Sequence, residues 1–469
     1  MSKHILIIGS GVIGLSTAYY CARRGHRVTV LERGPESRDG CSFGNAGMIT
    51  PSHFVPLAAP GMVVLGLKWM WNPESPFYIK PRLDWDLFNW AFKFWQASTA
   101  ARVNRAAPLL RDLNLASRAC FEELEDTWSG SSRREEAPTS QSAVNESLLT
   151  SAPTGDFGLV TKGLLMLCKT QHRLDEEAEF AAHANRLGVP AQVLDAKQAA
   201  AMDPAVTLDV VGAVFFPKDA HLPPGRFMAA LLAQCVAAGV QFEWNAEVVG
   251  WRAEAKRVVE VQLAPGAPVS NRRDVPSTAG AASDFPTQVG HLRSVAFDEF
   301  VLCGGAWSPL LARELGLSIP MQAGKGYSLT LPKPPQLPQL CSICTEARLA
   351  VTPMGTALRF GGTMEIAGLN EDINPVRVRG IIKSALKYFP AFKESDFDGV
   401  QPWRGLRPCS PDGLPYIGRT TKFANLSIAT GHAMMGLSLG PITGRLMAQV
   451  LSGEPPQFDL SLLSPDRYA

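Results

Sequence analysis

The most strongly patterned segment of the chain is residues 3–32, in which two apolar runs flank a stretch with helical periodicity. The first run, Ile5 to Ile8, is short and continuous, as is typical of a buried strand. A glycine-bearing turn and a helix-like stretch follow, and Val28 to Leu31 form the second run. The pattern therefore predicts a strand, a helix and a second strand in succession.

Helical and strand-like patterns alternate over the rest of the chain. Residues 84–127 have a helical pattern with many aromatic residues near its start. Further helices are predicted at 172–187, 224–238 and 307–316, and strands at 159–168, 211–216, 246–252, 324–331 and 357–363. This alternation is typical of a mixed α/β protein.

Four segments interrupt the alternation. Residues 41–56 are rich in Gly, Ser and Pro and are predicted to form a loop. The apolar residues 57–71 predict a core or lid helix, with a membrane-surface or partner contact as the alternative. Residues 129–154 and 264–290 are polar inserts. The second insert lies between strand-like residues 258–263 and 294–302, which predicts a hairpin excursion.

The turn between the first strand and the first helix carries the clearest chemistry. Gly9 permits a tight turn, Gly11 lets the backbone approach a phosphate, and Gly14 lets the helix lie close to the strand. Glu32 ends the second strand, eighteen positions after Gly14. A ribose-binding acid is expected about 20 residues on from such a turn. The segment therefore predicts a site for FAD or NAD, with the pyrophosphate at the helix N-terminus.

Composition narrows the class of protein. A chain of 469 residues with 46% hydrophobic and 19% charged residues is typical of a soluble globular protein of two domains or one large α/β unit. The net charge of +2 does not indicate a nucleic-acid partner. No apolar run approaches the length of a membrane span, and the N-terminal run lacks the features of a signal peptide.

The nine cysteines are scattered along the chain, which favours a reducing, cytoplasmic environment over a disulfide framework. Cys341 and Cys344 form a lone CxxC pair without a second pair or a nearby histidine. We therefore predict that they serve packing, and we predict no metal site.

Later segments add three candidate pieces of a site. Residues 301–308 and 429–436 each join a strand-like run to a glycine turn and a helix start, as a second approach to a dinucleotide would. An ordinary glycine-bearing turn is the alternative for each. Arg404 and Arg407 lie in the turn-rich segment 403–413, and arginine forms a planar bidentate clamp for a carboxylate. A pair of surface arginines is the alternative.

Taken in order, these motifs resemble the D-amino-acid dehydrogenase branch of the FAD-dependent D-amino-acid oxidase and glycine oxidase superfamily. The matching segments are 9–14 with Glu32, 42–49, 217–221, 246–248, 304–308, 324–328, 403–413 and 430–441. The resemblance implies an α/β (α+β) fold: a Rossmann-like FAD-binding domain interwoven with a mixed-sheet substrate domain. The expected FAD-binding domain comprises 1–56, 172–250, 293–318 and 400–469, and the substrate domain 57–171, 251–292 and 319–399.

The resemblance also implies roles for matching residues. The cofactor-binding residues expected are Gly9, Gly11, Val12, Ile13, Gly14, Glu32, Arg33, Ser42, Asn45, Ala46, Gly47, Met48, Val248, Gly304, Ala306, Trp307, Arg407, Gly431, His432, Met434, Met435, Gly436 and Leu437. The catalytic residues expected are Arg407, which grips the substrate carboxylate, Tyr327, Arg404 and His53. Related sarcosine oxidases attach FAD through a cysteine at a position where this chain has Gly405, so we predict non-covalent FAD.

The function implied is oxidation of a D-amino acid, or of a cyclic D-imino acid such as a D-proline derivative, by hydride transfer from Cα to flavin N5. Electrons would pass to a quinone or another carrier, with peripheral contact to the inner face of a membrane and no membrane span. Three rival readings remain: a glycine- or sarcosine-type oxidase that uses oxygen, the catalytic subunit of a hetero-oligomeric dehydrogenase, and a flavin-bearing binding protein without turnover. The residues alone do not fix the chirality or the side chain of the substrate.

Overall fold

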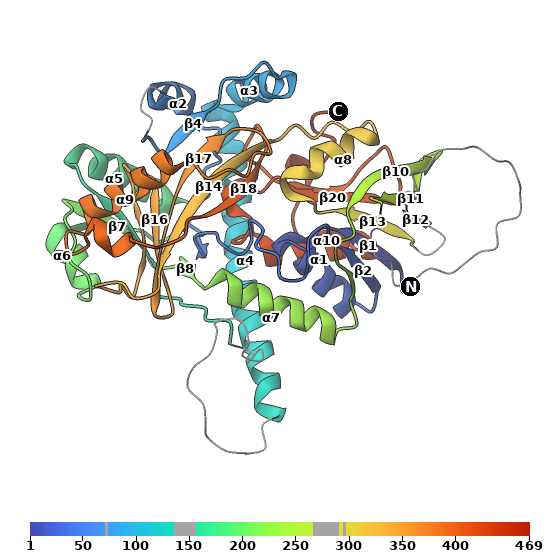
Figure 1. The fold of residues 1–469 in the computed structure, drawn as a ribbon, viewed down its shortest axis with the longest axis horizontal. Coiled ribbons are helices and arrows are strands. Elements are labelled where there is room, and N and C mark those ends of the chain that lie inside the picture. Colours follow the sequence, from blue (N-terminus) through green and yellow to red (C-terminus); the bar gives the residue numbers. More distant parts are fainter. Residues whose placement is uncertain (71–73, 136–155, 266–289, 294–296) are drawn as a thin grey trace, which may run out of the picture.

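The computed structural model describes residues 1–70, 74–135, 156–265, 290–293 and 297–469, and most of its strands assemble into two large sheets (Figure 1). The first sheet has six strands in the order β19-β20-β13-β1-β2-β9. These are β19 (Tyr416–Arg419), β20 (Leu426–Thr430), β13 (Glu299–Leu302), β1 (His4–Ile8), β2 (Arg27–Leu31) and β9 (Gln241–Glu243). All neighbours in it are parallel except β19 and β20. Together with α1 (Val12–Arg23), which follows β1, this is the predicted Rossmann-like unit.

The second sheet has nine strands and mixed directions. Its main path is β18 (Trp403–Cys409), β14 (Gln322–Leu331), β17 (Ala357–Ile366), β16 (Leu349–Met354), β15 (Cys341–Cys344), β5 (Leu164–Cys168), β7 (Gly212–Phe216) and β6 (Gln192–Asp195). A ninth strand, β4 (Phe77–Ile79), pairs with β17. The predicted α/β class with an interwoven mixed sheet is therefore confirmed.

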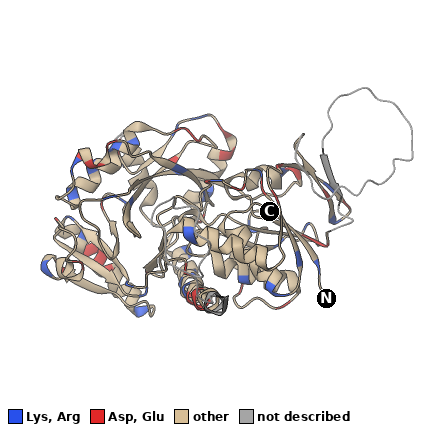
Figure 2. Cartoon of the chain, turned by 60° about the horizontal axis from the view of Figure 1, so that its bottom comes forward, with Lys and Arg blue, Asp and Glu red and all other residues tan. Residues whose placement is uncertain are grey.

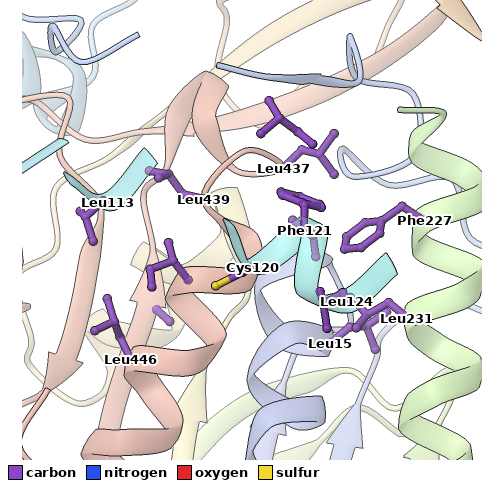
Figure 3. Close-up of a cluster of buried hydrophobic side chains, with 14 of the residues drawn as sticks. Leu15, Leu113, Cys120, Phe121, Leu124, Phe227, Leu231, Leu437, Leu439 and Leu446 are labelled. Atoms are coloured by element: carbon purple, nitrogen blue, oxygen red, sulfur yellow. The ribbon is translucent and has the colours of Figure 1, made fainter. Parts of the chain in front are cut away.

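Helices surround both sheets (Figure 1). The others are α2 (Met62–Met70), α3 (Trp85–Ala97), α4 (Ala100–Glu135), α5 (Gln171–Arg186), α6 (Ala196–Met202), α7 (Pro224–Ala237), α8 (Ser308–Glu314), α9 (Pro375–Tyr388) and α10 (Gly440–Ser452). Figure 3 shows the largest core cluster, where side chains of α1, α4, α7 and α10 meet. Leu15, Phe121, Phe227 and Leu446 are fully buried there.

The α1–α10 contact requires small residues, because a Cβ on Gly444 would lie 2.4 Å from the backbone of Ser16. This contact holds the C-terminal helix against the first helix of the dinucleotide unit. The C-terminal segment of the chain is thereby fixed to the element that follows β1.

Two small sheets complete the fold: β10 (Val248–Glu254), β11 (Arg257–Leu263) and β12 (Gly290–Arg293), and a pair of β3 (Met48–Ile49) with β8 (Ala220–His221). Strands β11 and β12 form an antiparallel hairpin around the second polar insert, but the predicted second strand, 294–302, is wrong: β12 ends at Arg293, and Glu299–Leu302 form β13 of the six-stranded sheet. Residues 266–289 of the insert lie outside the described part. The first insert, 129–154, starts within α4, which continues to Glu135, and its residues 136–154 also lie outside the described part.

The sheets divide the chain differently from the expected domain boundaries. Residues 172–250 and 400–469 were assigned to the FAD-binding domain, yet β6, β7 and β18 belong to the nine-stranded sheet. Residues 251–263 were assigned to the substrate domain, yet Val258 and Val261 pack in one core with Leu6 and Phe300 of the six-stranded sheet. These memberships depend on long-range pairings, such as β5 with β7, that local periodicity does not encode.

The charged residues of both signs are mixed over the molecule, and the cysteines are unpaired. Figure 2 shows Lys and Arg interspersed with Asp and Glu over both halves of the chain. All nine cysteines lie in the described part, and each is a free thiol. Cys341 and Cys344 are buried in two different cores on either side of β15. Within the described residues, no helix combines the length and apolar character needed to cross a bilayer.

Candidate cofactor and substrate site

A cavity of about 700 Å³ opens at the carboxyl ends of β1, β13 and β20. Its walls come from the glycine turn after β1, the loop 31–45, residues 246–249 and 303–311, strand β18 and residues 429–437. Segments from both ends of the chain therefore meet at one place. This position, outside the carboxyl ends of parallel strands, is where open α/β sheets bind their ligands.

The glycine turn has the geometry that its spacing predicts. Gly9 has a φ of 103°, and a Cβ there would lie 2.5 Å from the carbonyl oxygen of Cys303. A Cβ on Gly14 would lie 1.9 Å from the carbonyl oxygen of Gly9. Gly11 is the N-cap of α1 and has no side chain to cap the helix, and the first turn lines the cavity, where the backbone N–H of Val12 donates to Ser42 Oγ at 2.9 Å. Such a helix N-terminus attracts a phosphate.

Glu32 is held at the cavity wall by donors of the same turn. Its Oε2 accepts hydrogen bonds from the backbone N–H of Ser10 at 2.8 Å and from the Ser10 hydroxyl at 2.6 Å. Its Oε1 accepts one from the backbone N–H of Gly34 at 3.0 Å. Next to it, the guanidinium of Arg33 lies 3.5 Å above the ring of Trp307, and both line the cavity.

The loop that follows Glu32 is tied to the nine-stranded sheet. The carbonyl oxygen of Gly44 accepts a hydrogen bond from Ser328 Oγ at 2.9 Å, and that of Asn45 accepts one from Arg359 Nη1 at 2.8 Å. Trp403 Nε1 donates to the carbonyl oxygen of Asp39 at 3.0 Å. These contacts join the two sheets along the cavity. Sequence reasoning assigned no role to Arg359, whose position depends on the cross-strand register.

Residues 432–437 form the opposite wall. His432 is 2% exposed, and its Nε2 lies 3.0 Å from the hydroxyl of Thr443. Burial lowers the pKa of His432 to about 3, so its imidazole is neutral near pH 7. Its Nδ1 is buried and has no hydrogen-bond partner among the described residues. A ligand with a polar edge at this wall would satisfy that nitrogen.

Arg407 projects from β18 into the same cavity. Its Nη1 donates a hydrogen bond to the carbonyl oxygen of Thr363 at 2.7 Å. Its guanidinium lies against Gly326 of the neighbouring strand, where a Cβ would be 2.3 Å from both terminal nitrogens. The cavity thus has a fixed cation near residues 432–437.

Three of the expected catalytic side chains already have hydrogen-bond or ion-pair partners within the protein. Tyr327 is 1% exposed in the core of the nine-stranded sheet, where its hydroxyl donates to Glu365 Oε2 at 2.7 Å. Arg404 lines the cavity but pairs with Asp39 at 3.3 Å and Glu371 at 3.4 Å.

His53 is half-buried, and its Nδ1 lies 3.0 Å from the hydroxyl of Ser52. Ser52 in turn donates to the fully buried Asp219. Burial lowers the pKa of His53 to about 4, so its imidazole is neutral near pH 7.

Most expected cofactor residues converge on this one cavity. Those that line it are Gly9, Gly11, Val12, Ile13, Glu32, Arg33, Ser42, Asn45, Val248, Gly304, Ala306, Trp307, Arg407, His432, Met434, Gly436 and Leu437. The other six do not line it: Gly14, Ala46, Gly431 and Met435 are sequence neighbours of lining residues, whereas Gly47 and Met48 are not. Of these, Gly47 and Gly431 have positive φ and shape the turns.

The residues present fit an FAD molecule. The glycine turn leaves room for a pyrophosphate, Glu32 offers carboxylate oxygens to ribose hydroxyls, and His432 has an unsatisfied nitrogen at the far wall. The cavity extends between these two ends along α1 and the loop 40–45. An extended dinucleotide requires a cavity whose two ends lie far apart and differ in polarity.

Comparisons with known proteins also indicate an FAD-dependent protein. The sequence profile of the FAD-dependent oxidoreductase family matches residues 4–450. The chain is 32% identical to a D-amino acid dehydrogenase of Bradyrhizobium diazoefficiens, over 99% of both chains. It is also 32% identical to one of Methylobacterium radiotolerans, over 99% of this chain and 100% of that one. The crystal structure of glycine oxidase from Geobacillus kaustophilus has the same fold, with a TM-score of 0.70, 23% identity and full coverage of both chains.

Proposed function

The chain belongs to the family of FAD-dependent oxidoreductases, and on that premise we propose that it dehydrogenates D-amino acids or cyclic D-imino acids. The observation that carries the proposal is the position of Arg407 in the cavity that the glycine turn opens. A cation fixed at one end of a dinucleotide site is suited to an anionic substrate. The D configuration rests on the relatives, two of which are D-amino acid dehydrogenases at 32% identity.

In this proposal the chain binds and orients, and the cofactor supplies the redox step. When bound, FAD would supply the two-electron oxidation of the substrate carbon that carries the amino group. Arg407 holds the substrate carboxylate, and its hydrogen bond to Thr363 fixes the plane of the guanidinium. His432 remains neutral near pH 7 and offers its buried Nδ1 to the polar edge of the cofactor. The helix N-terminus after Gly11 binds the pyrophosphate, and Glu32 binds the ribose.

We propose that the FAD is held without a covalent bond. Related enzymes use a cysteine at the position of Gly405, and here that position faces the Trp403 indole. A Cβ on Gly405 would lie 2.2 Å from Trp403 Cη2, and one on Gly44 would lie 2.1 Å from Trp403 Cδ2. The indole therefore occupies the space that a side chain at residue 405 would need.

We propose a quinone or another carrier as the electron acceptor, and a cytoplasmic location with peripheral contact to a membrane. Nine free cysteines support a reducing compartment. The glycine- or sarcosine-type oxidase is the second candidate, because the glycine oxidase structure shares the fold over the full chain. Stoichiometric hydrogen peroxide during turnover in air would favour the oxidase over the dehydrogenase.

The role of Arg407 is tested by kinetics of Arg407→Met with a D-amino acid and an artificial acceptor. Loss of a charged bidentate contact, with its partner left unpaired, costs about 2–4 kcal/mol. This corresponds to a KM increase of roughly 30-fold or more. The control is the same comparison with the matching amine, which lacks the carboxylate and should not discriminate between wild type and variant. An unchanged KM for the amino acid would remove Arg407 from the substrate site.

A further inference from the structure

Helices α2 and α3 expose an unusual number of large apolar side chains. Trp85 is 81% exposed, Trp95 61%, and Leu83, just before α3, 99%. The full set, which we call the α2–α3 surface, comprises Val64, Leu67, Leu83, Trp85, Phe88, Phe92 and Trp95. Both helices lie along the same edge of the molecule in Figure 1, and both pack on β4, α2 through Gly66 and α3 through the core cluster of Leu87. A concentration of exposed large apolar side chains on two neighbouring helices is typical of an interaction site.

Helix α3 is apolar on two opposite faces. Its outer face carries exposed aromatic residues from Trp85 to Trp95 at spacings of three and four. Its inner face packs against the nine-stranded sheet, where Trp90 Nε1 donates to the carbonyl oxygen of Cys409 at 2.8 Å. Cys409 is two residues after Arg407 on β18. Helix α3 therefore covers β18, the strand that carries Arg407, and its exposed aromatic residues lie on the opposite side of the helix.

The charges around this surface are predominantly positive. Residues 57–105 contain six Lys and Arg against three acids. Each acid is ion-paired: Glu74 with Lys383, Asp84 with Arg82, and Asp86 with Arg313. Lys68 and Lys80 are exposed, and Arg102 and Arg105 are exposed at the start of α4, directly after α3.

We propose that the α2–α3 surface makes the membrane contact of the proposed function, on which this inference rests, and that it binds a lipid bilayer that contains anionic lipids. Tryptophan and phenylalanine insert at the level of the headgroups, and the surrounding cations interact with anionic lipids. The chemistry of the surface matches this occupant in both respects, because four of its seven apolar residues are aromatic and the net charge of residues 57–105 is positive.

The test is co-sedimentation of the FAD-loaded protein with vesicles, which needs no substrate and is therefore independent of the proposed reaction. Vesicles of phosphatidylcholine with phosphatidylglycerol should bind the protein, and salt should weaken binding. Trp85→Ser with Trp95→Ser should lower the partition coefficient at least tenfold. The matched control is Val236→Ser with Val193→Ser, two exposed apolar residues outside the α2–α3 surface and the cofactor cavity, which should leave binding unchanged.

Three outcomes would overturn the proposal. Wild-type protein would fail to sediment with these vesicles, or the Trp85 and Trp95 variant would bind as well as wild type. Alternatively, light scattering would show a concentration-dependent dimer that this variant abolishes, which would assign the surface to a second copy of the chain.

A separate observation concerns the support of Arg407. Thr363 lies within β17 with a φ of 64°, a region that a β-branched residue rarely adopts. Its carbonyl oxygen is the one that accepts the hydrogen bond from Arg407 Nη1. The strained backbone conformation therefore coincides with the acceptor that orients the guanidinium.

Because Gly326 has no side chain, the guanidinium of Arg407 can lie directly against its backbone. A Cβ there would lie 2.3 Å from Nη1 and Nη2 of Arg407 and 2.4 Å from Cζ. We infer that Gly326 and Thr363 are positioning residues that fix the guanidinium plane of Arg407 for a substrate carboxylate. This inference rests on the proposed function for its substrate, while the contacts that carry it are independent of that substrate.

The test compares Gly326→Ala with Gly361→Ala, a control on β17 where the nearest side-chain atom would be 3.8 Å away. We expect Gly326→Ala to raise the KM for the amino acid and the Kd of benzoate, read from the flavin absorbance, at least tenfold with kcat less affected. Gly361→Ala should leave both constants unchanged. Thr363→Gly relieves the strain but releases the carbonyl, so it should weaken benzoate binding several-fold without loss of thermal stability.

Equal benzoate affinities in wild type, Gly326→Ala and Thr363→Gly would overturn the inference. The benzoate measurement requires no turnover. If wild type binds benzoate and no D-amino acid reduces its flavin, the proposed function fails while the positioning role is still measured.

Discussion

Replacing Tyr327 by phenylalanine separates two roles for this residue. The resemblance to D-amino-acid dehydrogenases implies a contact with substrate, whereas the structure buries the ring and gives its hydroxyl to Glu365 at 2.7 Å. The backbone N–H of Asn374 also donates to this hydroxyl at 3.3 Å. Tyr327→Phe removes the hydroxyl and leaves the ring in place.

The size of the effect follows from the burial of Glu365, which is 6% exposed. A hydrogen bond to a charged group contributes about 1.5–3 kcal/mol, and loss of the donor leaves a buried carboxylate oxygen without it. Lys325 Nζ lies 3.9 Å from the same oxygen and compensates in part. We therefore expect Tyr327→Phe to lower the free energy of unfolding by about 2 kcal/mol. The KM should change by less than about twofold, because no contact with substrate is lost.

The assay is urea denaturation of the FAD-loaded protein together with steady-state kinetics. Tyr388→Phe is the matched control, since Tyr388 is also buried in this core and its hydroxyl donates to Glu346. Both variants should lose stability and keep their KM. A tenfold rise in KM for Tyr327→Phe, with stability unchanged, would refute the structural assignment and restore the substrate contact.

Three further changes have defined outcomes. Burial raises the pKa of Asp219 to about 7, above the value of about 4 in an unfolded chain, so its contribution to stability is complete below pH 4 and is lost as the pH rises through 7. Asp219→Asn should therefore flatten the decline in unfolding free energy between pH 4 and 7, and a decline as steep as that of wild type would contradict this. Glu32→Gln should raise the Kd of FAD about tenfold, measured by recovery of flavin fluorescence, since a charged acceptor of ribose hydroxyls becomes neutral. Gly405→Ala should lower stability by about 1–3 kcal/mol in thermal unfolding, because its Cβ would overlap the Trp403 ring; an unchanged Tm would show that the indole has room to move.

The dinucleotide unit was predictable because its information is local. Strand β1, the glycine turn, α1 and β2 follow one another within 32 residues, and Glu32 stands at the end of β2. The periodicity also predicted α5 and α7 within one or two residues of their observed ends. Such elements depend on neighbours in sequence, which a single chain displays directly.

The substrate side was less predictable because it depends on pairing across sheets. The register of β14 with β18 sets Tyr327 opposite Arg404 and Gly326 opposite Gly405, and a bulge lies between Lys325 and Tyr327. Whether a side chain on these strands faces the cavity or the core follows from that register. The ion pairs of Arg404 with Asp39 and Glu371 join segments more than 30 residues away, so no local pattern signals them.

The most direct test of the account is anaerobic titration of the oxidised, FAD-loaded protein with D- and L-amino acids, glycine, sarcosine and cyclic imino acids, followed by flavin absorbance. We predict that D-amino acids or cyclic D-imino acids bleach the flavin, that their L enantiomers do so far more slowly, and that Arg407→Met needs roughly 30-fold more substrate than wild type for the same rate of bleaching. Bleaching by glycine or sarcosine alone, or equal bleaching of wild type and Arg407→Met, would contradict the account.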